Sequence, residues 1–274
     1  MNRAAVFWIS LGCLLLTLSW AMPVDDLIAH AHKQHYAFRD GKLDDIAPLV
    51  QQLEAAITRE PRNAKLWLVL GHARMCLQTQ LFRTNAAPDR LIAVGEQAHE
   101  AYERARELDP DNSLALASRG MAGLSVALIR RDGPAMGRAV EDMNAAVREA
   151  PSSTGVRLTR AFTAIHMPPP LRDSQAVMHD LEFIINHAPG GRPEDVIHLL
   201  LGDVHAELGD LGAAAAEYGQ INGASAFALE QARSRIDELK RGAISSDSIA
   251  RVRATAGIDC ATCHAPGADN EHAE

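Results

Sequence analysis

Small and apolar residues recur along most of this chain at the three- and four-residue spacing of one helix face. The clearest stretch has Ala98, Tyr102 and Ala105 and ends at Pro110. Comparable stretches, each closed by a proline, are Leu49, Leu53, Ala56 and Pro61; Ala139, Met143, Ala146 and Pro151; and Val177, Leu181, Ile184 and Pro189. No run with the alternating period of a β-strand competes with them, so the sequence predicts an all-α protein.

Small residues hold matched places in these stretches, which indicates how the helices pack. A further stretch, after the turn Leu208-Gly209-Asp210, has Ala214 and Tyr218. Small residues allow two antiparallel helices to approach closely, while Leu, Tyr and Met fill the remaining space. The small residues at matched places are Gly71, Gly120, Gly202, Ala98, Ala139 and Ala214. One helix pair cannot bury its apolar face alone, so the pairs are expected to stack.

These stretches resemble the tetratricopeptide repeat (TPR) family. The residues that carry the resemblance are Trp67, Leu70 and Gly71 in a first helix and Ala98, Tyr102, Ala105 and Pro110 in a second. It extends from near Asp26 to Ile221. The resemblance implies an all-α TPR solenoid of about five helix hairpins over 22–223, a capping helix over 224–242 and a short, largely irregular tail over 243–274.

Two of the predicted units are longer than the 34-residue repeat. The second has about fifteen extra residues in the region of Gln78–Gly95, and the third has about seven around Arg130–Gly137. Extra residues enter loops or lengthen helices. In the fourth unit, Met167-Pro168-Pro169-Pro170 predicts a stiff, non-helical connection between two helices.

The N-terminus has the pattern of a Sec-type signal peptide over residues 1–21. Arg3 is followed by an apolar run from Ala4 to Trp20, and Ser19-Trp20-Ala21 gives small residues before a cut at Met22. The expected location is the periplasm. The alternative is an uncleaved N-terminal anchor in the inner membrane, because the run is close to the length that spans a bilayer.

Near the C-terminus, Cys260-Ala261-Thr262-Cys263-His264 matches the attachment motif for c-type haem. The two thiols of Cys260 and Cys263 form thioethers with the haem vinyl groups, and the imidazole of His264 is placed to bind the iron. Zinc needs a second pair of ligands, and a redox dithiol favours a helix start after a strand; neither signal is present. The sequence therefore predicts one covalent haem c per chain.

Only ten residues follow His264, fewer than a cytochrome domain uses to enclose its haem. The far face of the haem is therefore expected to be covered by the solenoid, a partner or a second copy. The candidate distal iron ligands are His272, downstream of the motif, and His166, Met167, His72 and Met75 if the tail folds back.

The concave face of such a solenoid is its usual binding surface. Projection of the first helices onto the helical period predicts an unusually apolar groove. The groove residues are Leu68, His72, Met75, Leu114, Met121, Leu124, Leu158, Phe162 and Ile165. This lining suits an apolar peptide, a partner helix, a lipid-like ligand or the chain's own tail. The other interpretation, a register shifted by one residue, makes them ordinary core.

The charge and the motifs of the chain exclude some classes of function. The net charge is −8, with 27 Lys and Arg against 35 Asp and Glu, and the basic residues are dispersed, so nucleic acid is not expected as a partner. No catalytic motif is present, and the protein is not expected to be an enzyme. Two functions remain: a haem-carrying periplasmic scaffold that docks a redox protein for electron transfer, or an adaptor for cytochrome maturation or an envelope complex. A membrane is expected as a partner only if the N-terminal segment is retained.

Overall fold

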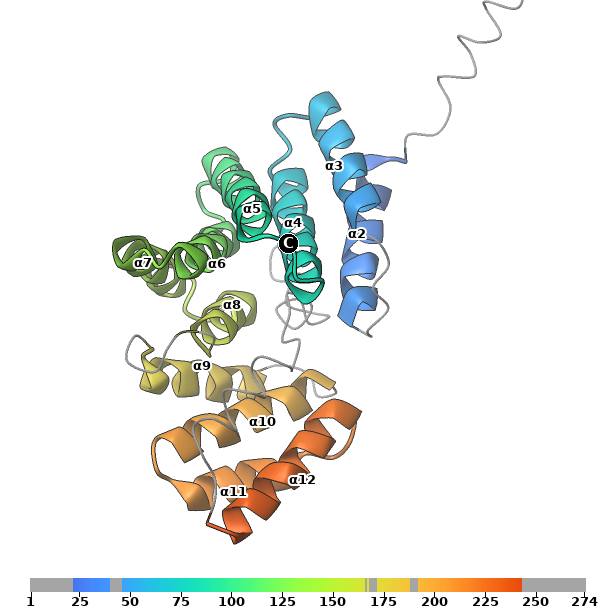
Figure 1. Cartoon of the computed structure of the whole chain (residues 1–274). Coiled ribbons are helices and arrows are strands. Elements are labelled where there is room, and N and C mark those ends of the chain that lie inside the picture. The colour runs from blue at the N-terminus through green and yellow to red at the C-terminus, as the bar shows by residue number, and fades with distance from the viewer. Residues whose placement is uncertain (1–21, 40–45, 166, 168–171, 188–191, 243–274) are drawn as a thin grey trace, which may run out of the picture.

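The computed structural model describes residues 22–39, 46–165, 167, 172–187 and 192–242. Over these ranges the chain forms eleven α-helices and no strand, which confirms the all-α prediction (Figure 1). The helices are α2 (Val24–Arg39), α3 (Ala47–Arg59), α4 (Ala64–Arg83), α5 (Pro88–Leu108), α6 (Ser113–Arg130), α7 (Gly133–Glu149), α8 (Thr154–Ile165), α9 (Ser174–His187), α10 (Arg192–Glu207), α11 (Leu211–Gln220) and α12 (Ala226–Lys240).

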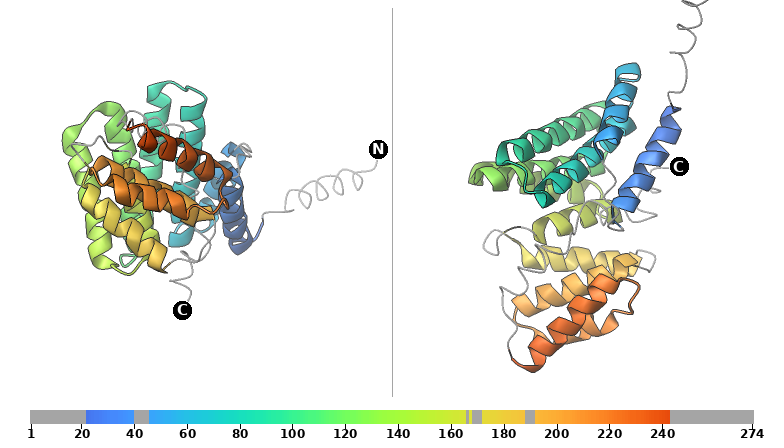
Figure 2. Two further views of the ribbon diagram at one scale, coloured as in Figure 1. Left: turned by 90° about the horizontal axis from the view of Figure 1, so that it is seen from below. Right: turned by 45° about the vertical axis from the view of Figure 1, so that its right-hand side comes forward.

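The helices pack in chain order. The most extensive contacts join helices that are consecutive in the chain: α6 with α7, α4 with α5, α5 with α6, α10 with α11, and α8 with α9. The pairs α4–α5, α6–α7, α8–α9 and α10–α11 are the hairpins of the stack (Figures 1 and 2). At one end of the stack α2 and α3 lie against α4; at the other, α12 lies against α10 and α11. The extensive contacts join helices no more than two apart in this order, so the core is a series of overlapping clusters.

Polar side chains mark where several helices begin. The side chains of Asn63, Asn112, Asp132, Asp210 and Ser225 each accept a hydrogen bond from the backbone N–H three residues further on, at distances of 2.9–3.2 Å. Such caps satisfy a backbone donor that has no partner within the helix. Asn63 and Asn112 each follow a proline-terminated helix, so the same short connection ends one helix and starts the next.

Glycine and tyrosine form the tightest contacts within two hairpins. An added Cβ would lie 2.5 Å from the Tyr102 ring at Gly71 and 2.3 Å from the Tyr218 ring at Gly202. Both tyrosines are buried. At Gly120 an added Cβ would lie 2.6 Å from the backbone oxygen of Ala139. The predicted close approach of paired helices at small residues is confirmed at these positions.

The extra residues of the second and third units lengthen their helices. Helices α4 and α5 have 20 and 21 residues, and α6 and α7 have 18 and 17, against 12 for α8 and 10 for α11. The lengthened ends of these helices enclose buried residues of their own. The buried amide of Gln78 donates to the Leu91 backbone oxygen at 2.9 Å and accepts from the Ser125 hydroxyl at 2.8 Å. A small apolar cluster surrounds it, formed by Leu81, Leu91 and Val94 with Ile129 packed against them.

Buried carboxylates attach α12 to the rest of the stack. Asp203 on α10 accepts from the Tyr218 hydroxyl at 2.8 Å and from Arg235 Nε at 3.1 Å. Burial, reinforced by the charge of Asp203, raises the pKa of the Tyr218 hydroxyl well above its ordinary value. Asp195 accepts from the backbone N–H groups of Asn222 and Ser225, at 3.0 and 2.7 Å, and so fixes the turn before α12. The predicted helix at this end is confirmed over Ala226–Lys240.

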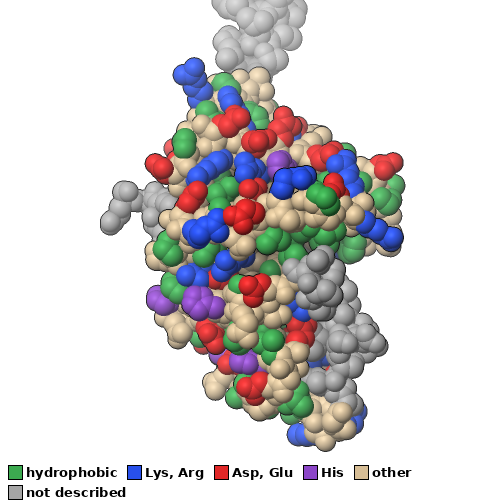
Figure 3. Space-filling view, turned by 90° about the vertical axis from the view of Figure 1, so that its left-hand side faces the viewer, with side chains coloured by type: hydrophobic (Ala, Val, Ile, Leu, Met, Phe, Trp, Pro, Cys, Tyr) green, Lys and Arg blue, Asp and Glu red, His purple; other side chains and the backbone are tan. Residues whose placement is uncertain are grey.

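Acidic and basic side chains are interspersed over the face shown in Figure 3. Within the described ranges, no helix combines the length and the apolar character needed to cross a bilayer.

Replacement of Gly202 with Ala should destabilise the protein. The new methyl group would overlap the Tyr218 ring, whose hydroxyl is held by Asp203, so the α10–α11 hairpin has to open. Overpacking of this kind costs about 1–3 kcal/mol of unfolding free energy, measurable by chemical denaturation. The control is Gly137→Ala on α7, where no atom lies within 4 Å of an added Cβ. That variant should be as stable as the parent or slightly more so. Equal stability of the Gly202→Ala variant and the parent would contradict the prediction.

Candidate functional site

A small, partly open hollow of about 10 Å³ lies between α2, α3 and α4. Its polar groups are His32 on α2 with His72 and Cys76 on α4. His72 and Cys76 are four residues apart and therefore share one face of α4. The remaining lining is Ala31, Ile46, Leu49, Val69 and Ala73. This volume has room for about one water molecule and is far below that of a small-molecule site, and the lining is mostly apolar.

The imidazole of His72 is the most buried polar ring of this hollow, at 5% exposed. Its ring centre lies 5.3 Å from that of Tyr102, at an interplanar angle of 58°. Tyr102 is itself fixed by its contact with Gly71, so the hairpin contact and the orientation of His72 depend on each other. Cys76 is 1% exposed. The structure thus brings an imidazole and a thiol to one apolar wall, although no group of three or more side chains suited to a metal ion occurs among the described residues.

The predicted groove residues lie in the core. Leu124, Leu158, Phe162 and Ile165 belong to one cluster with residues of α7, α9 and α10, and each is at most 3% exposed. Met75 is buried with residues of α2 and α3, and Leu114 with residues of α7 and α8. Leu68 and Met121 are partly buried against these clusters. The structure does not place this set on an open groove.

These residues are buried because the first helix of a hairpin contacts other helices on both of its sides. Helix α6, for example, contacts α5, α7 and α8, which leaves little of its apolar surface for a ligand. Of the two interpretations that the sequence left open, burial supports ordinary core for these residues. His72 differs because it also lines the hollow.

The candidate iron ligands separate into two groups. Cys260, Cys263, His264, His272 and His166 lie outside the described residues. Met167 is 5% exposed and packs in the core cluster that contains Ile165 and Val177. Met75 is also buried, at 6% exposed. Among the described candidates, His72 is the one that the structure places beside a cavity.

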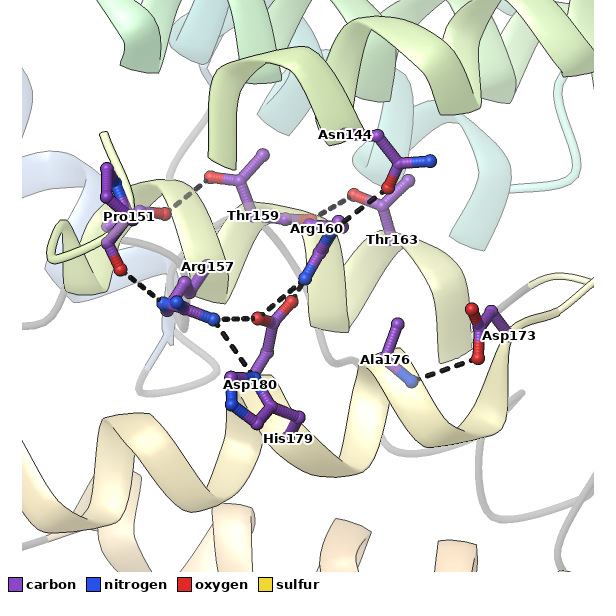
Figure 4. Close-up of polar contacts among 11 residues, drawn as sticks. Asn144, Pro151, Arg157, Thr159, Arg160, Thr163, Asp173, Ala176, His179 and Asp180 are labelled. Atoms are coloured by element: carbon purple, nitrogen blue, oxygen red, sulfur yellow. Dashed lines mark hydrogen bonds and ion pairs between the residues drawn. The ribbon is translucent and has the colours of Figure 1, made fainter. Parts of the chain in front are cut away.

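A buried ionic cluster at the α8–α9 hairpin was missed by the sequence analysis (Figure 4). Arg157 Nη1 donates to Asp180 Oδ1 at 2.6 Å, and Arg160 donates to both Asp180 oxygens at 2.7 and 2.8 Å. Arg157 also donates to the backbone oxygen of Pro151 at 2.7 Å and lies 4.3 Å from the centre of the Phe183 ring. Asp180 is fully buried.

This cluster holds α8 and α9 together, and its contacts indicate a structural role. Both oxygens of Asp180 are engaged, and Arg160 also reaches Asn144 on α7 at 3.0 Å. The signal was present in the sequence. Asp180 follows Val177 by three residues on the face that Leu181 and Ile184 bury, a place where an acid requires a cationic partner.

The chain matches no family model, and no curated protein matches it either. The tetratricopeptide resemblance therefore remains a prediction from the motifs.

Replacement of Asp180 with Ala should strongly destabilise the protein. The change leaves the buried guanidinium of Arg157 without its counter-charge, and removal of one partner of a buried pair costs about 3–5 kcal/mol. The free energy of unfolding, from chemical denaturation, measures this cost. The control is Glu182→Ala, at an exposed residue of the same helix, which should change the free energy of unfolding by less than about 0.5 kcal/mol. If both variants lose the same amount, the cluster does not hold the hairpin.

Proposed function

We propose that this protein is an exported tetratricopeptide scaffold that carries one covalent haem c and docks a protein partner for electron transfer. The observation that carries the proposal is the motif Cys260-x-x-Cys263-His264 in a chain that begins with the pattern of a signal peptide. Haem attachment takes place on exported chains, so the two ends of the sequence support each other. The expected location is the periplasm.

In this proposal, the residues of the tail bind the cofactor. Cys260 and Cys263 form the thioether bonds, and His264 supplies the proximal nitrogen to the iron. The haem supplies one-electron redox chemistry, and the helical stack determines which partner comes within range. We assign the protein a carrier role and no catalytic one.

The described residues offer one place where this tail could dock. The hollow between α2, α3 and α4 has apolar walls and the imidazole of His72, a chemistry that suits the edge of a haem. Eighteen residue steps separate Gly242 from Cys260, and an extended chain of this length spans about 60 Å. At about 10 Å³ the hollow cannot enclose a haem, so only the edge of the haem would contact it and a partner would cover the remainder.

We further propose that the helix hairpins form a solenoid of the tetratricopeptide type. The support is the close glycine–tyrosine contact at Gly71 and Gly202 and the packing of hairpins in chain order. In such a stack, stability is roughly a sum over hairpins and their interfaces.

The second candidate function is a periplasmic binding or assembly adaptor without a redox role. The observation that favours it is the stack of helix hairpins itself, because stacked repeats usually offer an extended surface for a protein partner.

The test is an absorbance spectrum of the chain produced in a periplasm that contains the cytochrome c maturation factors. We expect haem bands in the oxidised and reduced states, and the colour should stay with the chain after denaturation because the attachment is covalent. The double variant Cys260→Ala with Cys263→Ala should lose the colour. Cys76→Ala is the matched control, since Cys76 is a buried helix residue outside the motif and its loss should leave the haem attached.

Two outcomes separate the candidates. A colourless parent chain would reject the haem carrier and leave the adaptor. A coloured His72→Leu variant whose reduced-state bands differ from those of the parent would identify His72 as the distal ligand, whereas unchanged bands would exclude it.

A further inference from the structure

The two long hairpins, α4–α5 and α6–α7, present their turns at the same edge of the molecule (Figure 2). This follows from their topology, because consecutive helices run in opposite directions and every second turn returns to one side. The extra residues of these units build this edge. We call residues 82–90 and 130–138 the hairpin tip.

The hairpin tip combines an exposed aromatic ring with clustered positive charge. Phe82 is 66% exposed, the highest value among the exposed large hydrophobic residues of the described chain. The tip has five arginines and two acids in a protein whose net charge is −8. The arginines, all exposed, are Arg83, Arg90, Arg130, Arg131 and Arg138, of which Arg130 is ion-paired with Glu96 at 2.7 Å. Of the two acids, Asp132 is engaged as the cap of α7.

The tip is held firmly by the structure beneath it. Leu81 and Leu91 are buried in the small cluster with Ile129, directly under the turn. The backbone N–H of Ala86 donates to the Leu81 oxygen at 2.9 Å, and that of Asp132 donates to the Ala127 oxygen at 3.0 Å. Phe82 therefore points to solvent while the residue before it is in the core. A single exposed apolar residue needs no explanation, but an exposed aromatic ring at an edge that also carries several arginines, on a well-packed projection, suggests an interface.

We propose that the hairpin tip docks the protein on an anionic lipid surface. Guanidinium groups pair with lipid phosphates, and an aromatic ring enters the boundary between headgroups and acyl chains. The tip projects from the ends of two hairpins and does not line the hollow, so it suits a broad, soft surface better than an acidic protein, which would need a pocket for the Phe82 ring. This docking does not depend on the N-terminal apolar segment or on haem.

The experiment measures partition of the purified full chain into vesicles of phosphatidylcholine alone and of phosphatidylcholine with phosphatidylglycerol. The readout is the ratio of the two partition coefficients, in which any contribution of the N-terminal segment to both vesicles cancels. We expect a ratio well above one that falls as salt screens the charges.

The double variant Arg90→Gln with Arg138→Gln should lower the ratio about 25-fold, five-fold for each charge. Phe82→Ala should lower partition into the anionic vesicles about ten-fold.

Matched control variants test whether binding depends on the hairpin tip in particular or on any exposed arginine or apolar residue. Arg59 and Arg62 are exposed at the opposite edge, where α3 ends and α4 begins, and their double replacement with Gln should leave the ratio unchanged. Leu211 is 44% exposed at the α10–α11 turn, and Leu211→Ala should not alter partition. A ratio near one for the parent chain, tip variants that bind like the parent, or controls that lose as much as the tip variants would each overturn the proposal. Circular dichroism confirms that every variant is folded.

Discussion

The close approach of two helices within each hairpin is the constraint on which the structure depends. Gly71 and Gly202 leave room for the rings of Tyr102 and Tyr218, and these rings take the space that a side chain on the first helix would need. The distance between the helices is therefore set by the thickness of an aromatic ring against bare backbone. The orientation of His72 beside Tyr102, and so the wall of the hollow, follows from the same contact.

Buried charge specifies the second half of the stack in a way that apolar packing alone does not. Asp180 joins α8 to α9 through two arginines, Asp203 joins α10 to α11 and α12, and Asp195 fixes the turn before α12. A carboxylate in the core tolerates few arrangements, because its oxygens must keep their donors. Such contacts add less to stability than to the choice of one register between neighbouring hairpins.

The helices and their pairing could be predicted from the spacing of residues such as Ala98, Tyr102 and Ala105, since that spacing reflects contacts within one hairpin. The burial of Leu124, Leu158 and Ile165 could not, because it depends on helices from the next hairpin along the chain. The partners of Asp180 lie 20 and 23 residues away, beyond any local pattern. The predicted haem-attachment motif differs, because Cys260, Cys263 and His264 are recognised in the sequence alone and lie outside the described residues.

The packing of helices in chain order also limits how far a disturbance travels. Because each helix has extensive contacts only with helices up to two places away, the free energy of opening one hairpin is a local quantity. The extension under the hairpin tip, with Gln78 at its centre, and the Asp203 cluster at the other end share no such contact. Amide hydrogen exchange in the two regions can therefore proceed through separate openings, and one end of the molecule can unfold and refold while the other stays folded.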